Sequence, residues 1–175
     1  MSADASATDP PLHPALEALR PLLGTFEGGG HGDYPTIDAF DYHERVTIGH
    51  RGTPVLGYEQ RTWHPLRGTA MHGESGYLRP AGEGRVEVML AHVFGVTELL
   101  EGDYELGADG GVTLRLSSTT IGLAATAKDV RSVRRELRFD RVGLGYDVWM
   151  AHADVPETHH LAAVLHRTGP TGASS

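Results

Sequence analysis

The sequence Thr158-His159-His160-Leu161-Ala162-Ala163-Val164-Leu165-His166-Arg167 follows a turn at Val155-Pro156-Glu157 and joins a histidine pair to a run of small and apolar residues. We interpret this run as a β-strand, in which successive side chains point to opposite faces. His159 and His160 therefore cannot both face one cavity. One ring faces the interior, and the other faces solvent or a neighbouring strand.

An inward imidazole at the rim of an apolar pocket has the chemistry of an axial ligand for a planar iron cofactor. The alternative interpretation is a solvated strand end in which neither histidine is a ligand. This stretch alone leaves both interpretations open, because the pocket has to come from the rest of the chain.

Length and composition describe an ordinary globular chain. Its 175 residues suffice for one domain with a sizeable core, and 39% of them are hydrophobic and 22% charged. The sequence contains no cysteine, which excludes disulfides, thiolate nucleophiles, iron–sulfur clusters and cysteine-ligated zinc. The formal net charge of −8 argues against a nucleic-acid partner, because basic residues are too few and too dispersed to follow a phosphate backbone.

No uninterrupted apolar run is long enough to cross a membrane, and the first ten residues lack the basic and apolar regions of a signal peptide. We therefore expect a cytoplasmic protein without a membrane partner. Residues 1–11 and 169–175 have the composition of disordered tails, which leaves residues 12–168 as one folded domain. The sequence leaves the oligomeric state open between a monomer and a homodimer.

The stretch 12–23 has helical spacing, because its leucines recur at intervals of three and four residues. Pro14 suits a first helical turn, whereas Pro21 limits the length of the helix. We expect a short N-terminal helix that serves as a lid or plug.

After Gly24 the pattern changes to short segments that end at glycine- and proline-rich turns. These segments are 24–33, 40–50, 55–64, 71–79, 85–94, 96–106, 112–120, 124–140, 144–153 and 159–167. Several of them alternate in polarity, as Val86, Val88 and Leu90 do. The long segment 124–140 does not keep strict alternation, so we expect a bulge within it.

Ten consecutive segments with hairpin-length connections predict an all-β fold, a ten-stranded antiparallel up-and-down β-barrel that leaves no free sheet edge. A β-sandwich is the main alternative. A ten-stranded barrel is wider than its own side chains need, so we expect it to hold a ligand.

The stretch Gly24-Thr25-Phe26-Glu27-Gly28-Gly29-Gly30 resembles a phosphate-binding loop, but no strand precedes it and no basic residue or helix follows it. We interpret its glycines as positions where a sharply curved first strand approaches a neighbouring backbone closely.

Other residues have two readings each. Eleven histidines raise the question of zinc, but seven of them are spread over six predicted strands, and a three-histidine site would require such strands to converge. His72 and Glu74 share a strand face, either as an acid–base pair or as part of a polar barrel wall or outer surface.

Thr36 lies in a turn and either caps local backbone or contacts a bound group at the barrel mouth. Lys128 either pairs with a carboxylate, such as a cofactor propionate, or faces solvent.

Taken in order, several blocks of the sequence resemble those of the nitrobindin family, small haem-binding β-barrels shaped like fatty-acid-binding proteins. The blocks are Gly24-Thr25-Phe26-Glu27-Gly28-Gly29-Gly30, Tyr34-Pro35-Thr36-Ile37, Phe40-x-Tyr42-x-Glu44, Met71-His72-x-Glu74-x-Gly76-Tyr77-Leu78-Arg79, Val86-Glu87-x-x-Leu90-Ala91-His92, Thr126-Ala127-Lys128-x-Val130 and His160-Leu161-x-Ala163-x-Leu165-x-Arg167. The resemblance runs from about residue 12 to residue 167, and the order and spacing of the blocks carry it.

The resemblance implies a barrel that holds one haem b, mostly ferric, near an open end. The family's proximal histidine directly precedes the leucine of the last block, which assigns the iron ligand to His160. Thr36 and Lys128 match family positions near the haem. The implied function is the isomerisation of peroxynitrite to nitrate together with nitric oxide binding, with the iron as the reactive centre and no further catalytic residue.

Two other functions remain open, a non-catalytic barrel that binds an apolar small molecule such as a fatty acid, and a haem-based nitric oxide carrier or sensor. We expect the pocket face opposite His160 to be apolar and without an acid–base group. Two positions depart from the family pattern. Phe26 replaces the tryptophan of the opening signature. The segment Val93-Phe94-Gly95 stands where the family usually has a proline and a small hydroxyl residue, so Phe94 either alters the pocket rim or packs outside.

Overall fold

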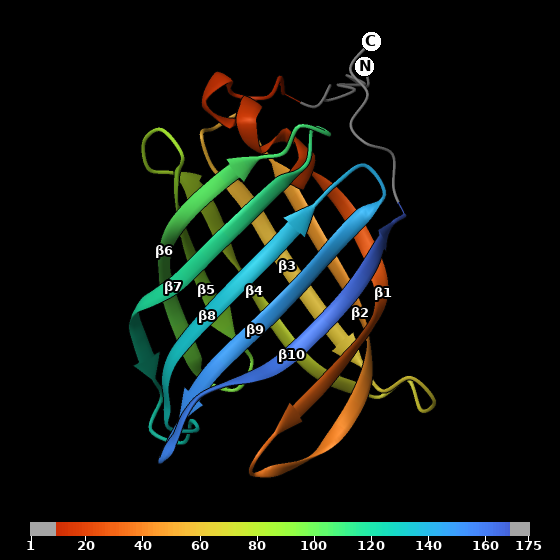
Figure 1. Cartoon of the computed structure of the whole chain (residues 1–175), viewed down its shortest axis with the longest axis vertical. Coiled ribbons are helices and arrows are strands. Elements are labelled where there is room, and N and C mark those ends of the chain that lie inside the picture. The colour runs from red at the N-terminus through yellow and green to blue at the C-terminus, as the bar shows by residue number, and fades with distance from the viewer. Residues whose placement is uncertain (1–9, 169–175) are drawn as a thin grey trace, which may run out of the picture.

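The computed structural model describes residues 10–168, and within them one 3₁₀ helix precedes ten strands (Figure 1). The elements are η1 (Pro14–Leu22), β1 (Gly24–Tyr34), β2 (Ile37–His50), β3 (Leu56–Trp63), β4 (Ala70–Pro80), β5 (Arg85–His92), β6 (Val96–Leu106), β7 (Val112–Leu123), β8 (Val130–Phe139), β9 (Gly143–His152) and β10 (Val155–Arg167). Residues 1–9 and 169–175, most of the two predicted tails, lie outside the described part of the chain.

The strands form one closed antiparallel barrel in which each strand pairs with its neighbours in sequence. The first and last strands close it, with a ladder that runs from Phe26 opposite Arg167 to Gly32 opposite Leu161. The predicted up-and-down barrel is therefore confirmed, and the sandwich alternative is wrong. Within residues 10–168 no helix is long and apolar enough to cross a membrane.

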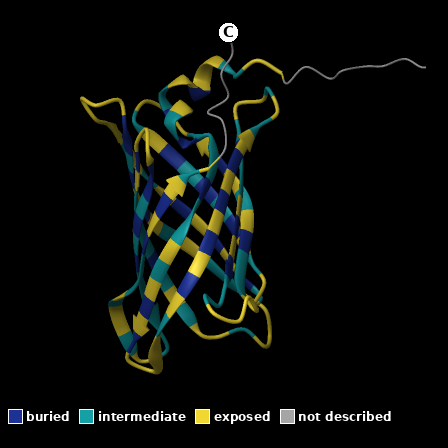
Figure 2. Cartoon of the chain, turned by 90° about the vertical axis from the view of Figure 1, so that its right-hand side faces the viewer, coloured by how far each residue is buried: buried dark blue, intermediate teal, exposed yellow. Residues whose placement is uncertain are grey.

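Burial alternates along the strands, as Figure 2 shows by its bands of colour. On β2, Tyr42, Glu44, Val46 and Ile48 are buried, and the residues between them are exposed. The alternation follows from the pleat, which sends successive side chains to the lumen and to solvent. It also carries a charged residue, Glu44, into the lumen between apolar neighbours.

The glycines of β1 allow neighbouring groups to come close, as predicted. A Cβ at Gly28 would collide with the backbone of Val164 and Leu165 on β10. A Cβ at Gly30 would collide with the ring of Tyr42, which lies over this strand. These glycines therefore permit the tight closure between β1 and β10 and leave room for an aromatic wall.

The helix η1 closes one end of the barrel. Its residues Leu16, Leu19 and Leu22 are each 0% exposed. A 3₁₀ helix has three residues per turn, so this spacing places all three leucines on one face. Pro21 lacks the N–H that a longer α-helix would need, which favours the tighter helix. The plug that we expected is therefore present, although its buried leucines recur every three residues rather than at intervals of three and four.

Arg167 joins the end of β10 to η1. Its guanidinium donates to the carbonyl oxygens of Leu23 and Pro21 and lies 4.5 Å above the ring of Phe26. These carbonyls stand at the C-terminal end of η1, where they would otherwise lack partners. One side chain thus fixes the helix, the first strand and the last strand together.

The long strand predicted over 124–140 is wrong in its first part. β7 continues to Leu123, residues 124–129 form a loop, and β8 starts at Val130. The Ala127 N–H donates to the Ala124 carbonyl at 2.9 Å, which closes a turn within the small-residue stretch. The predicted bulge is confirmed between Val130 and Ser132, where the pairing with β9 shifts.

We expect Leu19→Ala to lower the free energy of unfolding by about 2–5 kcal/mol, because the change leaves a cavity beneath η1. Urea unfolding followed by circular dichroism measures this change. Leu66→Ala is the matched control, since Leu66 is 92% exposed and its truncation should change stability by less than about 0.5 kcal/mol. Equal effects of the two substitutions would show that η1 does not close the barrel.

Candidate functional site

A cavity of about 430 Å³ occupies the barrel near the end opposite η1. Its mouth lies among the turns that carry Ile37, Phe94 and Lys128. The apolar part of its wall consists of Ile37, Phe40, Met71, Val96, Val130, Val133, Leu137, Val148, Met150 and Leu161. This volume lies within the range of small-molecule and cofactor pockets, so the barrel has the ligand space that ten strands predict.

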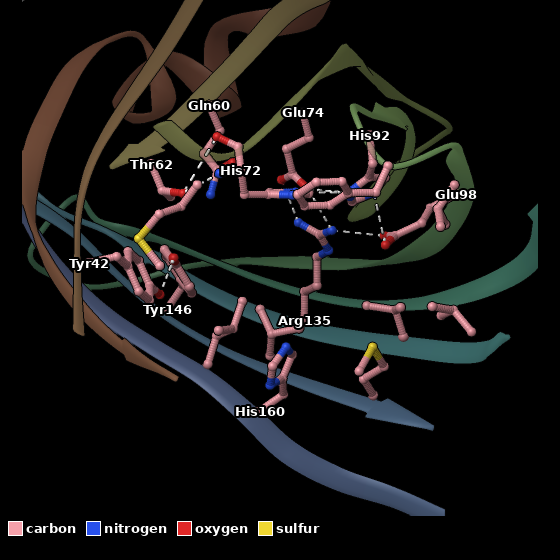
Figure 3. Close-up of a pocket in the computed structure, with 18 of the residues that line it drawn as sticks. Tyr42, Gln60, Thr62, His72, Glu74, His92, Glu98, Arg135, Tyr146 and His160 are labelled. Carbon is pink, nitrogen blue, oxygen red and sulfur yellow. Dashed lines mark hydrogen bonds and ion pairs between the residues drawn. The ribbon is translucent and has the colours of Figure 1, made fainter. Parts of the chain in front are cut away.

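His160 faces the cavity from β10 (Figure 3). His159 pairs with Trp149 and Leu161 with Val148, so His160 is an extra residue opposite β9. Such a β-bulge re-aims a side chain locally. The edge of the Tyr34 ring lies against the imidazole, with 5.1 Å between ring centroids, and holds it in place.

The hydrogen bonding of His160 leaves one ring nitrogen available as a ligand. Nδ1 lies 3.2 Å from the carbonyl oxygen of Asp33, which can only accept, so Nδ1 carries the proton. Nε2 has no hydrogen-bond partner among the described residues and keeps its lone pair. Burial lowers the pKa of His160, and the nearby charges of Lys128 and His159 lower it further. The ring is therefore neutral at physiological pH.

His159 faces the outside of the barrel, so the two histidines face opposite sides as predicted, and the bulge at His160 makes His159 the outward member. Its side chain is 48% exposed, and Nε2 lies 2.9 Å from Asp147 Oδ1. The edge of its ring contacts Trp149, with centroids 5.2 Å apart. Only His160 of the pair is thus placed to meet a group in the cavity.

The other two predicted site residues lie at the mouth. Lys128 is exposed, stands in the β7–β8 loop and lines the cavity. Thr36 is exposed in the β1–β2 turn, where its neighbour Ile37 lines the cavity and Thr36 itself does not. The roles of both residues toward a bound group stay predictions.

The expectation of an apolar face opposite His160 is wrong. Figure 3 shows a polar cluster on the far wall, formed by His72, Glu74, His92, Glu98 and Arg135. Glu74 and Glu98 are each only 5% exposed. The wall therefore holds buried carboxylates, a guanidinium and two imidazoles, and it does contain acid–base groups.

Arg135 binds both carboxylates. Nη1 donates to Glu74 Oε1 at 2.7 Å, and Nη2 donates to Glu74 Oε2 at 3.0 Å and lies 2.9 Å from Glu98 Oε2. Burial alone would raise the pKa of Glu74, but the charge of Arg135 and hydrogen bonds from His72 and Arg135 hold it well below its ordinary value. The pKa of Glu98 is lowered by the same guanidinium, against the effect of burial. Both carboxylates are therefore ionised at neutral pH.

A third buried carboxyl group, that of Glu44, accepts hydrogen bonds from uncharged side chains. Gln60 Nε2 donates to Oε1 at 2.7 Å, and the Tyr146 hydroxyl donates to Oε2 at 2.6 Å. The Tyr146 hydroxyl also lies 2.8 Å from that of Tyr42. Burial raises the pKa of Glu44 to about 7, although the bonds from Tyr146 and Gln60 oppose this rise. This group can therefore exchange a proton near neutral pH.

The two departures from the family pattern have different positions. Phe26 is 0% exposed and packs edge-on against Phe139 with centroids 5.6 Å apart, in the closed end of the barrel. Phe94 is 61% exposed, lines the mouth and lies against His72 with centroids 5.3 Å apart. Phe94 thus forms part of the pocket rim, and Phe26 has a packing role.

Sequence reasoning did not find Arg135, Glu98 or Glu44 as charged residues of the cavity, although a signal was present. Each stands two positions from buried apolar residues of its own strand, such as Val133 before Arg135 and Leu100 after Glu98. The two-residue period of a strand therefore places all three inside.

A closed ten-stranded barrel with a histidine facing an internal cavity defines a ligand-binding β-barrel. The family model described as "THAP4-like, heme-binding beta-barrel domain" matches residues 15–167. The chain therefore belongs to this family of haem-binding barrels, the nitrobindins, and its cofactor is haem.

Several characterised relatives match nearly the whole chain. Peroxynitrite isomerase 2 of Mycobacterium avium is 49% identical over 156 residues, which cover 89% of this chain and 96% of that protein. Peroxynitrite isomerase of Nocardia farcinica is 47% identical, with 89% of this chain and 92% of that protein covered. The crystal structure of Rv2717c from M. tuberculosis has a TM-score of 0.88 and 45% identity, and covers 91% of this chain and 100% of that one.

We expect the stability of the haem-free protein to depend on pH through Glu44. Between pH 4.5 and about 7 the folded state keeps this proton and the unfolded state loses it, so the free energy of unfolding falls as the pH rises. The loss amounts to about 3 kcal/mol. Glu44→Gln cannot ionise, so its stability relative to the wild type should increase across this window.

Urea unfolding at pH 5 and at pH 8 measures this relative stability, and other titrating groups cancel between the two proteins. Glu101→Gln is the matched control on an exposed residue. A Glu44→Gln variant with the same pH dependence as the wild type would contradict the assignment.

Proposed function

We propose that this chain binds one ferric haem b through His160, isomerises peroxynitrite to nitrate and binds nitric oxide at the same iron. The relatives named peroxynitrite isomerase support the reaction. The observation that carries the proposal is the free Nε2 of a neutral, half-buried imidazole at the cavity edge. Iron needs such a lone pair, and a protonated imidazole could not supply it.

The residues of the cavity fit a haem. Nε2 of His160 would ligate the iron, and the Asp33 carbonyl would fix the ring orientation through Nδ1, as outer partners of ligating histidines do. Apolar side chains such as Val133, Val148 and Met150 line the space beside this ring. Lys128 would pair with a propionate at the mouth, and Thr36 would contact the haem edge from the β1–β2 turn.

The bound haem would supply an iron with an open coordination position for peroxynitrite or nitric oxide. The protein would contribute confinement, because walls that exclude bulk water keep reactive fragments together until they recombine. His72, which is 28% exposed on its side chain, lies near the mouth on the wall opposite His160 and would hydrogen-bond an entering anion through Nε2.

A fatty acid suits this cavity less well. A carboxylate held deep in the cavity, away from Lys128 at the mouth, requires a free cation there, and Arg135 is already paired with Glu74 and Glu98. Burying an additional carboxylate beside this cluster would leave it without a partner.

We expect haemin added to the purified full-length protein to give a Soret band that reaches saturation at one haem per chain. His160→Ala should shift this band and weaken haem binding by at least tenfold, because the iron loses its protein ligand. His159→Ala removes the neighbouring outward ring and serves as the matched control, with an unchanged spectrum. Equal spectra for both variants would rule out His160 as the ligand.

We expect the haem-loaded protein to accelerate peroxynitrite decay in stopped-flow measurements and to yield nitrate rather than nitrite. The haem-free protein and haem-loaded His160→Ala should show little acceleration. Addition of nitric oxide to the haem-loaded protein should shift the Soret band. A haem-loaded protein that responds to nitric oxide but leaves peroxynitrite decay unchanged would be a carrier or sensor instead.

A further inference from the structure

Three ligand-type atoms converge on the cavity wall opposite His160. They are His72 Nε2, His92 Nδ1 and Glu74 Oε2, which come from β4 and β5. His72 Nε2 lies 3.1 Å from His92 Nδ1 and 3.8 Å from Glu74 Oε2, and His92 Nδ1 lies 3.2 Å from Glu74 Oε2. The adjacent pairing of β4 with β5, in which Glu74 stands opposite His92, produces this convergence.

The triangle has the dimensions of one face of a tetrahedral metal site. Zinc binds imidazole nitrogen and carboxylate oxygen at about 2.0–2.2 Å, which places neighbouring ligand atoms of a tetrahedron about 3.3–3.6 Å apart. The three observed separations, 3.1, 3.2 and 3.8 Å, bracket this value. A single ion could therefore contact all three atoms after small side-chain shifts.

Neighbouring side chains contact two of these ligands from behind, as the residues that orient metal ligands do in metalloproteins. Glu74 Oε1 accepts from Arg135 Nη1 at 2.7 Å and from the Tyr58 hydroxyl at 3.0 Å, which orients the carboxylate. His92 Nε2 lies 3.0 Å from Glu98 Oε1, although the angle is too bent for a well-formed hydrogen bond. A carboxylate behind a ligating histidine is the usual arrangement at zinc sites.

The charges of the wall favour a bound cation. Glu74 and Glu98 carry two negative charges, and Arg135 carries one positive charge, so one negative charge remains in a buried place. Glu98 Oε1 lies 3.0 Å from His92 Nε2, so a proton on that nitrogen would face a carboxylate and would leave a lone pair on Nδ1. That lone pair lies 3.2 Å from Glu74 Oε2 and 3.1 Å from His72 Nε2, and a proton or a metal ion among these three atoms makes the contact favourable.

We propose that His72, His92 and Glu74 bind one divalent transition-metal ion of the zinc type, with the fourth position of the tetrahedron open to the cavity. Two imidazoles and one carboxylate form a common ligand set for zinc sites that keep an open position. His72 is 28% exposed on its side chain, so an ion can enter from the mouth.

The site is separate from the iron ligand. Figure 3 shows His160 on one wall and the three ligands on the other. A bound divalent ion would change the net charge of the far wall from negative to positive, and an anion entering the cavity would then meet a cation instead of carboxylates. Metal occupancy would thus control which ligands the cavity accepts.

Titration of Co²⁺ and Zn²⁺ into the full-length, haem-free protein tests the proposal. We expect one Co²⁺ per chain, with the intense visible absorption bands of a tetrahedral ion, and stoichiometric displacement by Zn²⁺. His72→Ala should weaken Co²⁺ binding at least tenfold, and Glu98→Gln about 10–100-fold through the outer partner. His152→Ala is the matched control, since His152 lines the same cavity outside the cluster.

The same titration with His160→Ala separates this proposal from haem binding, because that variant lacks the iron ligand and keeps all three metal ligands. His92→Ala should also weaken Co²⁺ binding. If that variant fails to fold, as judged by circular dichroism, the His72→Ala variant still tests the proposal, because His72 is partly exposed. Failure to bind Co²⁺, or binding that His72→Ala leaves unchanged, would overturn the proposal and would indicate that a proton alone occupies the cluster.

Discussion

The guanidinium of Arg135 crosses the lumen from β8 to reach Glu74 on β4 and Glu98 on β6, and the layout of the barrel interior depends on this ion cluster. Buried ions of this kind are costly to desolvate and are retained only where each has partners. Toward the closed end each strand continues with packed apolar residues, such as Leu78 after Glu74 and Phe139 after Arg135. The cluster therefore separates a solid core from a cavity that side chains do not fill.

The two walls of the cavity consequently differ in chemistry. On one side, His160 stands among apolar residues with its protonation fixed by the Asp33 carbonyl, a setting that suits a neutral ligand to iron. On the other side, ligand-type atoms of two imidazoles and one carboxylate lie within 4.8 Å of one another. A cofactor bound between these walls would contact mainly apolar side chains on one side and imidazoles and carboxylates on the other. The protein would therefore offer hydrogen bonds and charge on one side only.

Much of the fold was predictable because it rests on local rules. Alternation and turn residues define ten strands, and adjacent strands in sequence are adjacent in space. Alternation predicted that His159 and His160 face opposite sides, but the inward member came from the family resemblance, because the bulge at His160 interrupts the alternation that Leu161, Ala163 and Leu165 follow. The inward charges were not predicted, because charged residues are rarely buried unless paired, and the partners of Arg135 lie on strands far away in the sequence, with 61 positions between Arg135 and Glu74. No pattern among neighbouring residues indicates an ion pair across the lumen. The sequence likewise gave no sign that residues 124–129 form a loop and that β8 begins only at Val130.

The closure of the barrel between β1 and β10 has a consequence for biosynthesis. Arg167 binds the Pro21 carbonyl across 146 positions of the chain, so this contact can form only after the ribosome has released residue 167. Until then the growing sheet exposes the unpaired edge of β1 and the edge of its most recent strand, both of which can recruit other chains. A chain that is still being synthesised therefore has free sheet edges that the closed barrel lacks, and chaperones that shield such edges should raise its yield.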